Sequence, residues 1–200
     1  MIDYVAVFVA FFAVVDPIGT VPVFIAVTRD VDPGGRRRIA GVATLTAAAI
    51  LIFFVIAGEP ILTAMAIPLP AFQIAGGIVL FLFALSMIFG ESKPDEEIRM
   101  ADERDQAAIY PLAVPSIASP GAMLAAVLAT ENSRFSVWEQ VQTAVVMLAV
   151  LGLAYALMLL ASPIHRLIGH SGASVVSRVM GLILASVATA NTLAGIKEYF

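Results

Sequence analysis

Residues 14–22 read VVDPIGTVP and lie in the middle of an apolar run, residues 4–28, that is long enough to cross a bilayer. They place a carboxylate, two prolines and a glycine at a depth where hydrocarbon offers no hydrogen-bond partner. Asp is a preferred N-cap residue and Pro is favoured at the first helical position, so Asp16 and Pro17 predict a half-helix running to Thr28. The first span is therefore predicted to be broken near its middle. A kinked helix that Asp16 merely caps is the alternative.

The composition is typical of a helical membrane protein. Of the 200 residues, 60% are hydrophobic, and the mean hydropathy is +0.98. The sequence has no basic patch that could bind a phosphate backbone, so we do not expect nucleic acid as a partner. The absence of cysteine excludes disulfides, thiolate nucleophiles and Cys-ligated zinc. The first residues lack the positive region and the cleavage site of a signal peptide, so we expect the first apolar run to stay in the mature protein.

The other apolar runs predict five more spans. Four of them are uninterrupted, over residues 39–57, 71–89, 141–161 and 175–196. We expect residues 58–60, Gly-Glu-Pro, to end the second span, and residues 61–70 to form a connection at the membrane interface. Residues 163–172 predict a loop, and its two histidines are five residues apart, which fits no zinc motif.

The remaining run, residues 110–130, is broken like the first. Prolines stand at positions 111, 115 and 120, and Ser119 followed by Pro120 is again an N-cap before a proline, which predicts a second half-helix over residues 120–130. The two broken runs align either by their proline spacing or by their caps, and the sequence leaves both alignments open.

The chain divides into two similar halves, residues 1–90 and 109–200, joined by a polar cytoplasmic linker over residues 91–108. Gly76 with Gly181 and Gly90 with Gly195 share one offset, which also pairs Gln73 with Arg178 and Ser86 with Asn191. The glycines are expected to let helices approach closely. We predict an all-α membrane protein with six transmembrane helices, arranged as two three-helix repeats of inverted topology whose first and fourth helices are discontinuous.

The basic residues suggest an orientation in the plasma membrane. With six crossings and the N-terminus outside, only Arg134 and Lys197 of the eleven Lys and Arg residues lie outside the cytoplasm. If the first and fourth runs are instead re-entrant hairpins, Arg166 and Arg178 are the two outside, so charge does not separate the topologies. Full spans are favoured because the runs are long enough to cross.

These residues resemble the MarC family of six-span membrane proteins over almost the whole chain. The motifs that carry the resemblance are DPIG at 16–19, VPVF at 21–24, PLAVP at 111–115, SPGA at 119–122, AGG at 75–77 and the closing pattern of residues 178–196. In the family a basic residue commonly stands at the position of Gln73, an acidic one near Ser86 and a Gln at Asn191, whereas Arg178 keeps its basic residue.

The resemblance to the transporter members of this family implies alternating-access transport or exchange of small neutral amino acids of the glycine and alanine class. A passive channel and a non-transporting membrane subunit are the alternatives. An enzyme is not expected, because the spans carry neither two carboxylates nor a buried histidine.

The predicted substrate site lies where the two breaks meet. Half-helix N-termini and hydroxyls would face the carboxylate of a zwitterion, and the Asp16 carboxylate or unwound backbone carbonyls would hold its ammonium group. Small residues would leave space for a small side chain. The candidate residues are Asp16, Pro17, Gly19, Thr20, Ser116, Ser119, Pro120, Gly121, Ser86 and Asn191. No cofactor or metal is expected, coupling to H⁺ or Na⁺ stays open, and the expected partners are the substrate, the lipid bilayer and possible copies of the same chain.

Overall fold

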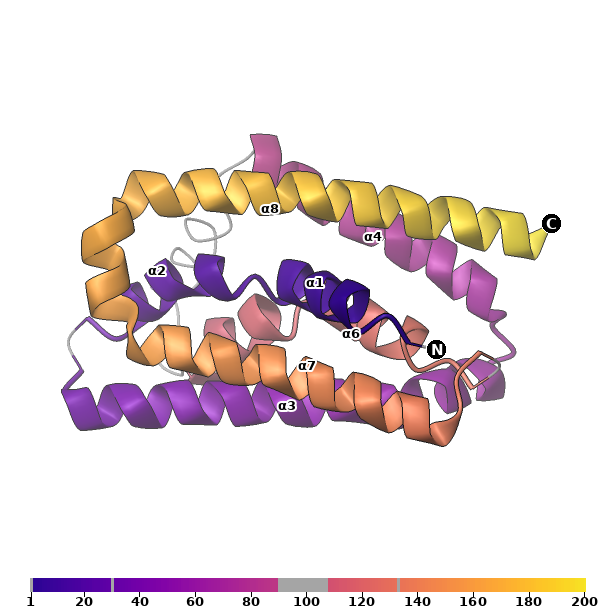
Figure 1. The fold of residues 1–200 in the computed structure, drawn as a ribbon, viewed down its shortest axis with the longest axis horizontal. Coiled ribbons are helices and arrows are strands. Elements are labelled where there is room, and N and C mark those ends of the chain that lie inside the picture. The colour runs from indigo at the N-terminus through magenta and orange to yellow at the C-terminus, as the bar shows by residue number, and fades with distance from the viewer. Residues whose placement is uncertain (1, 30, 90–107, 133) are drawn as a thin grey trace.

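The computed structural model describes residues 2–29, 31–89, 108–132 and 134–200, and the elements in these ranges are all helical (Figure 1). In chain order they are α1 (Tyr4–Val15), α2 (Pro17–Val27), α3 (Pro33–Ala64), α4 (Leu69–Phe89), η1 (Ala108–Ile117), α6 (Pro120–Leu128), α7 (Val137–Leu159) and α8 (Ala161–Tyr199). The predicted linker, apart from its last residue, lies outside the described residues.

The predicted helical membrane fold is confirmed. Helices α3, α4, α7 and α8 are each long and apolar enough to cross a bilayer, and α1 and α2 together form a fifth such span. The pair η1 and α6 makes a sixth, bent by 48° at its break. The first broken run passes as one span, whereas the bent pair is either one broken span or a re-entrant loop, so full crossing by the second run stays a prediction. The inverted relation of the two halves stays a prediction.

The broken spans lie inside the molecule. Figure 1 shows α1, α2 and α6 between one pair of helices, α3 with α7, and a second pair, α4 with α8. The most apolar stretch of α1 and α2 is 67% buried by the rest of the protein, against 22–33% for the other four spans. Protein rather than lipid therefore surrounds the first broken helix, as the freed backbone groups require.

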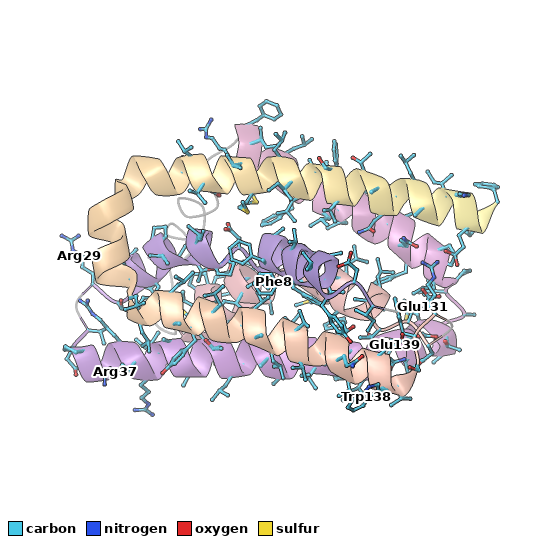
Figure 2. The ribbon with its side chains drawn as sticks, in the orientation of Figure 1. Phe8, Arg29, Arg37, Glu131, Trp138 and Glu139 are labelled. Atoms are coloured by element: carbon cyan, nitrogen blue, oxygen red, sulfur yellow. The ribbon has the colours of Figure 1, made fainter. Side chains whose placement is uncertain are left out.

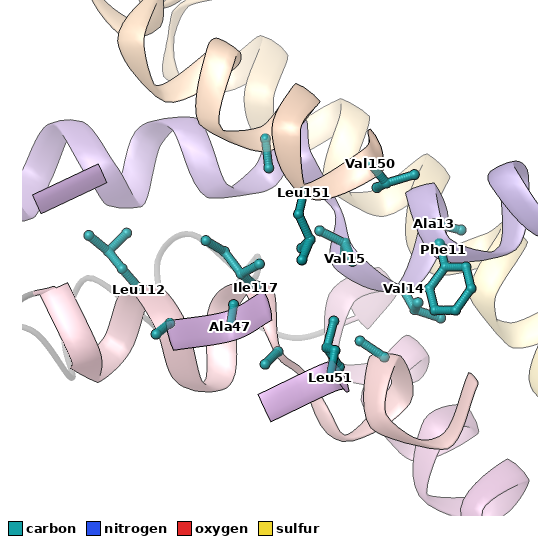
Figure 3. Packing of buried hydrophobic residues seen from close by; sticks show 14 of the residues in the cluster. Phe11, Ala13, Val14, Val15, Ala47, Leu51, Leu112, Ile117, Val150 and Leu151 are labelled. Carbon is teal, nitrogen blue, oxygen red and sulfur yellow. The ribbon is translucent and has the colours of Figure 1, made fainter. Parts of the chain in front are cut away.

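Close packing around the breaks depends on small residues at helical spacing. On α3, Ala40, Ala43 and Ala47 are fully buried, and η1 and α6 pack against this helix. Figure 3 shows Ala47 and Leu51 of α3 opposite Ile117, with Val15 of the first break packed beside Leu151 of α7.

Glycines hold α4 and α8 together, as expected for helices in lipid. A Cβ at Gly77 would overlap the Thr192 side chain, one at Gly181 would stand 3.1 Å from the Ala84 carbonyl oxygen, and one at Gly195 would stand 3.0 Å from that of Pro70. Residue numbers rise along α4 while they fall along α8, so the two helices pack antiparallel.

The predicted end of the second span is wrong. Helix α3 runs through residues 58–60 to Ala64, which shortens the predicted connection at 61–70. Gly58 is buried where a Cβ would stand 2.5 Å from Val127, so this glycine serves close packing against α6 rather than helix termination. The Thr63 hydroxyl donates to the Glu59 carbonyl oxygen at 3.0 Å in the last turns.

The predicted loop at residues 163–172 is also wrong, because the backbone there is the beginning of α8. Pro163 falls in the first turn of this helix, where a backbone N–H has no intrahelical acceptor and proline is tolerated. Figure 1 shows the helix changing direction after these turns. The side chains of His165 and His170 lie outside the part of the chain whose side chains the structure describes.

Charged residues gather at the two ends of the helices. Figure 2 shows Arg29 and Arg37 at one end, and Glu131, Trp138 and Glu139 at the other, where both chain termini also lie. Large apolar side chains on the outer sides of the long helices, such as Leu45, Ile56 and Leu182, are exposed, which suits contact with lipid. We refer to the two ends as the arginine end and the terminal end.

Candidate functional site

The first break is closed by Asp16. This residue is left-handed, with φ 47° and ψ 65°, a conformation that Asp tolerates better than most residues. Its N–H donates to the Phe12 carbonyl oxygen at 3.0 Å and ends α1, while its Oδ1 accepts the Gly19 N–H at 3.0 Å and begins α2. The predicted N-cap, with Pro17 at the first helical position, is confirmed.

The second break is closed by Ser119. Its Oγ accepts the Ala122 N–H at 3.1 Å, which confirms the predicted cap of α6, a helix that ends at Leu128. The same hydroxyl donates to the Val14 carbonyl oxygen at 2.9 Å, near the end of α1. One buried hydroxyl thus serves a helix start and a helix end on different spans.

A second hydrogen bond joins the two broken spans. Thr20 and Ser116 are both fully buried, and their hydroxyl oxygens are 3.1 Å apart, so that either can donate. Thr20 also lies 3.1 Å from the Asp16 carbonyl oxygen, to which its hydroxyl can donate. The structure therefore brings together four predicted site residues, which we name the junction cluster: Asp16, Thr20, Ser116 and Ser119.

A cavity of about 280 Å³ lies between α1, α4, α6 and α8. It reaches from Glu131 and Arg134 at the terminal end to Val14 and Gly121 beside the junction cluster. We name it the terminal-end cavity. Gly121 and Asn191 are the predicted site residues in its wall, whereas the junction cluster, Pro17, Gly19, Pro120 and Ser86 are not part of it.

The space expected beside the glycines is filled. A Cβ at Gly19 would overlap the carboxylate of Asp16, and one at Gly121 would overlap the side chain of Leu80. Both glycines permit close contacts rather than leaving room for a substrate. Pro17 is buried next to the first break, whereas Pro120 is exposed. Ser86 donates to the Phe83 carbonyl oxygen of its own helix at 2.8 Å.

Sequence reasoning missed most polar residues of this cavity. Gln73 on α4 was noted for its pairing with Arg178 in the repeat and as a departure from the family pattern, but not as a site residue, although an amide in an apolar span is itself a signal. Glu131 and Arg134 belong to a turn that resembles an ordinary solvated connection. The sequence gives no direct sign that α1 and α8 bring this turn to a cavity.

Ion pairs close the mouth of the cavity. The Arg134 Nε lies 2.9 Å from Glu131, which is 5% exposed, and the same guanidinium pairs with Glu198 near the end of α8. The hydrogen bond with Glu198 raises the pKa of Arg134 more than partial burial lowers it, and the charge of Glu131 adds to the rise. The Asn132 N–H donates to Glu59 at 2.7 Å, so this turn is also tied to α3.

A second cavity, of about 410 Å³, lies at the arginine end between α2, α3, α7 and α8. Phe24 and Thr28 line it together with Arg36 and Arg37. Along the first broken span, the terminal-end cavity touches residues up to Val14 and this second cavity touches residues from Phe24 onward. The junction cluster therefore lies between two cavities that approach it from opposite ends.

In the part of the chain that the structure describes, no three His, Cys, Asp or Glu side chains are placed to hold a metal ion.

Comparison with known proteins gives a consistent result. Residues 1–200 match the family described as MarC family integral membrane protein. A UPF0056 membrane protein of Methanocaldococcus jannaschii is 34% identical over 197 residues, covering 97% of this chain and 96% of the relative. The UPF0056 inner membrane protein YhgN of Escherichia coli is 32% identical over 186 residues, covering 93% and 92%. No solved structure matches the chain.

The spans and these relatives together agree on the location of the protein. Five or six helices are able to cross a membrane, and YhgN is named an inner membrane protein. The protein is a multi-pass protein of the plasma membrane, as its apolar runs predict.

Proposed function

Because the chain belongs to the MarC family of integral membrane proteins, we propose that it is a secondary transporter or exchanger of small neutral amino acids of the glycine and alanine class. The observation that supports this most is the junction cluster, where two interrupted helices meet inside the protein between cavities from opposite ends. Discontinuous helices that meet near the bilayer midplane are a common substrate site in secondary transporters.

The proposed cycle alternates access to the junction cluster. In the conformation described, Leu80 packs against Gly121 in the cavity wall, next to the α6 N-terminus. Movement of α4 and α8 against the broken helices would uncover the α6 N-terminus for a carboxylate and Asp16 for an ammonium group. The opposite movement would open the route from the arginine end. A small substrate fits, since 280 Å³ is at the low end of the roughly 300–1,000 Å³ of ligand pockets.

Ion coupling follows from the same cluster. Asp16 is a buried carboxylate at the break, so it is the proposed site for a coupled proton. Na⁺ would depend on the carbonyl and hydroxyl oxygens around it.

Counterflow in proteoliposomes tests this function. Substrate on the far side should accelerate uptake of labelled glycine or alanine through a carrier, whereas a pore shows no such acceleration and a non-transporting subunit moves nothing. We expect Asp16→Asn and Pro120→Ala to reduce exchange while the purified variants unfold at temperatures close to that of the wild type. Wild-type exchange rates in both variants, or an absence of acceleration in the wild type, would contradict the proposal.

A further inference from the structure

The terminal-end cavity has an amide side chain in its wall that is open to a ligand or to water from the cavity. Gln73 is 6% exposed and lines the cavity, and its side chain makes no hydrogen bond with any residue that the structure describes. Polar groups in a pocket wall that make no bond within the protein are free to fix the orientation of a bound molecule. An amide in this position therefore suits a ligand that enters the cavity.

A second amide stands on the adjoining helix. Asn191 of α8 is half-buried, lines the same cavity and makes no hydrogen bond within the described part of the chain. The close contact of Gly77 with Thr192 keeps α4 and α8 together at this level. Each amide offers two donors and one acceptor, so the pair can serve both a carboxylate and an ammonium group.

The charges of the cavity lie at its mouth. Arg134 is paired there with Glu131 and Glu198, whereas the wall further in is formed by apolar residues such as Val14, Leu80 and Val187 besides the two amides. A ligand with a net charge would give up its hydration beyond the mouth of the cavity and would find no opposite charge there to compensate for the desolvation cost. A zwitterion avoids most of this cost when hydrogen bonds meet both of its ends.

We propose that Gln73 and Asn191 hold the ligand of the terminal-end cavity and select a small molecule with no net charge that carries both hydrogen-bond donors and acceptors. The cavity is then the first binding site on the route to the junction cluster. This inference rests on the carrier function proposed above for its choice of an amino acid as ligand. The volume of about 280 Å³ restricts that ligand to a small one.

A change of ligand charge tests the selection. The probes are glycine, which has no net charge at pH 7, and glycinamide, a cation of nearly the same size, and binding to the purified full-length protein is measured by calorimetry. The wild type should bind glycine more tightly. Gln73→Glu adds a carboxylate to the cavity, so the ratio of glycine affinity to glycinamide affinity should fall about tenfold.

Gln73→Leu is the second variant, because it removes the amide without adding a group that can be protonated. It should weaken glycine binding about tenfold, as expected when polar ends lose their partners. Gln142→Leu is the matched control: this amide lies on α7, outside the cavity wall, and its removal should leave binding unchanged. Glycine affinity within about twofold of the wild type in both Gln73→Leu and Asn191→Leu would overturn the inference.

Failure of the carrier function can be distinguished from failure of the role proposed for the two amides. Exchange of glycine by the wild type, combined with normal glycine binding by both Gln73→Leu and Asn191→Leu, would overturn the role of the amides and leave the carrier in place. Binding that depends on Gln73, without any acceleration in counterflow, would leave the role of the amides in place and contradict the carrier.

Discussion

The two breaks in the membrane-spanning part of the chain are closed in different ways. At the first, Asp16 bonds to Phe12 and Gly19, both within its own span. At the second, Ser119 caps α6 and also reaches the Val14 carbonyl oxygen on the other span. These two bonds of Asp16 are local, whereas Ser119 also connects the two spans.

The difference follows from the chemistry of the two caps. The Asp16 side chain acts at the first break through an acceptor, since its Oδ1 accepts the Gly19 N–H. A hydroxyl both donates and accepts, so Ser119 can stand between an N–H and a carbonyl oxygen. The Ser119 hydroxyl therefore suits a joint between two helices.

The largest loss of stability is expected from Gly19→Ala, because the first break is closely packed at Gly19. Gly19→Ala would place a Cβ on the Asp16 carboxylate and displace the cap, and overpacking of this kind together with a lost cap costs about 3 kcal/mol. Gly41→Ala is the control, because nothing lies within 4 Å of its Cβ position. Unfolding midpoints in detergent should separate the two variants, and equal midpoints would show that the first break is not tightly closed.

Ser119→Ala should have the next largest effect. It removes a cap and leaves the Val14 carbonyl oxygen without its donor, a loss of about 2 kcal/mol. Ser136 is a matched cap at the exposed start of α7, and in the part of the chain that the structure describes its side chain bonds only to Glu139 of the same helix, so Ser136→Ala should cost about 1 kcal/mol. The same loss in both, from thermal unfolding, would mean that the bond to Val14 contributes nothing.

Thr20→Val tests the other connection between the spans. Valine keeps the shape of threonine but cannot form the hydrogen bond to Ser116, which should lower the free energy of unfolding by about 1 kcal/mol. Thr28→Val is the control, since the buried Thr28 hydroxyl bonds, among the described residues, only to the Phe24 carbonyl oxygen one turn earlier. A larger loss of unfolding free energy in Thr28→Val would contradict a stabilising role for the contact between spans.

Asp16→Asn should change stability least. Asparagine keeps an oxygen for the Gly19 N–H and also tolerates the left-handed backbone, so we expect a loss below about 1 kcal/mol. Asp16→Ala has neither property and should unfold at a clearly lower temperature. If both variants are equally destabilised, the charge rather than the cap closes the first break.

Short sequence signals predicted the breaks correctly. Asp16 with Pro17 and Ser119 with Pro120 each combine a cap with a residue that starts helices, and the structure begins α2 and α6 there. Such signals act within four residues, so no knowledge of the tertiary structure is needed. The hydrogen bond between Ser119 and Val14 joins residues 105 positions apart and could not be predicted in this way.

The errors arose where tertiary packing decides the meaning of a residue. Gly58 looked like a helix end but lies against Val127 of α6, and Pro163 looked like part of a loop but lies in the first turn of α8. Gly121 looked like open space, and Leu80 from α4 fills it. For the site, the sequence predicted the junction cluster, while Gln73, Glu131 and Arg134 needed the arrangement of four helices.

The only tryptophan of the chain, Trp138, is 69% exposed in the first turn of α7, four residues after Arg134. Its emission is therefore an intrinsic optical reporter for the mouth of the cavity, free of overlap from any other indole. Because the chain has no cysteine, a single cysteine introduced on α8 can carry a quencher or a spin label, and no native cysteine has to be removed first. Opening of the Arg134 ion pairs can then be followed in real time on the otherwise native protein.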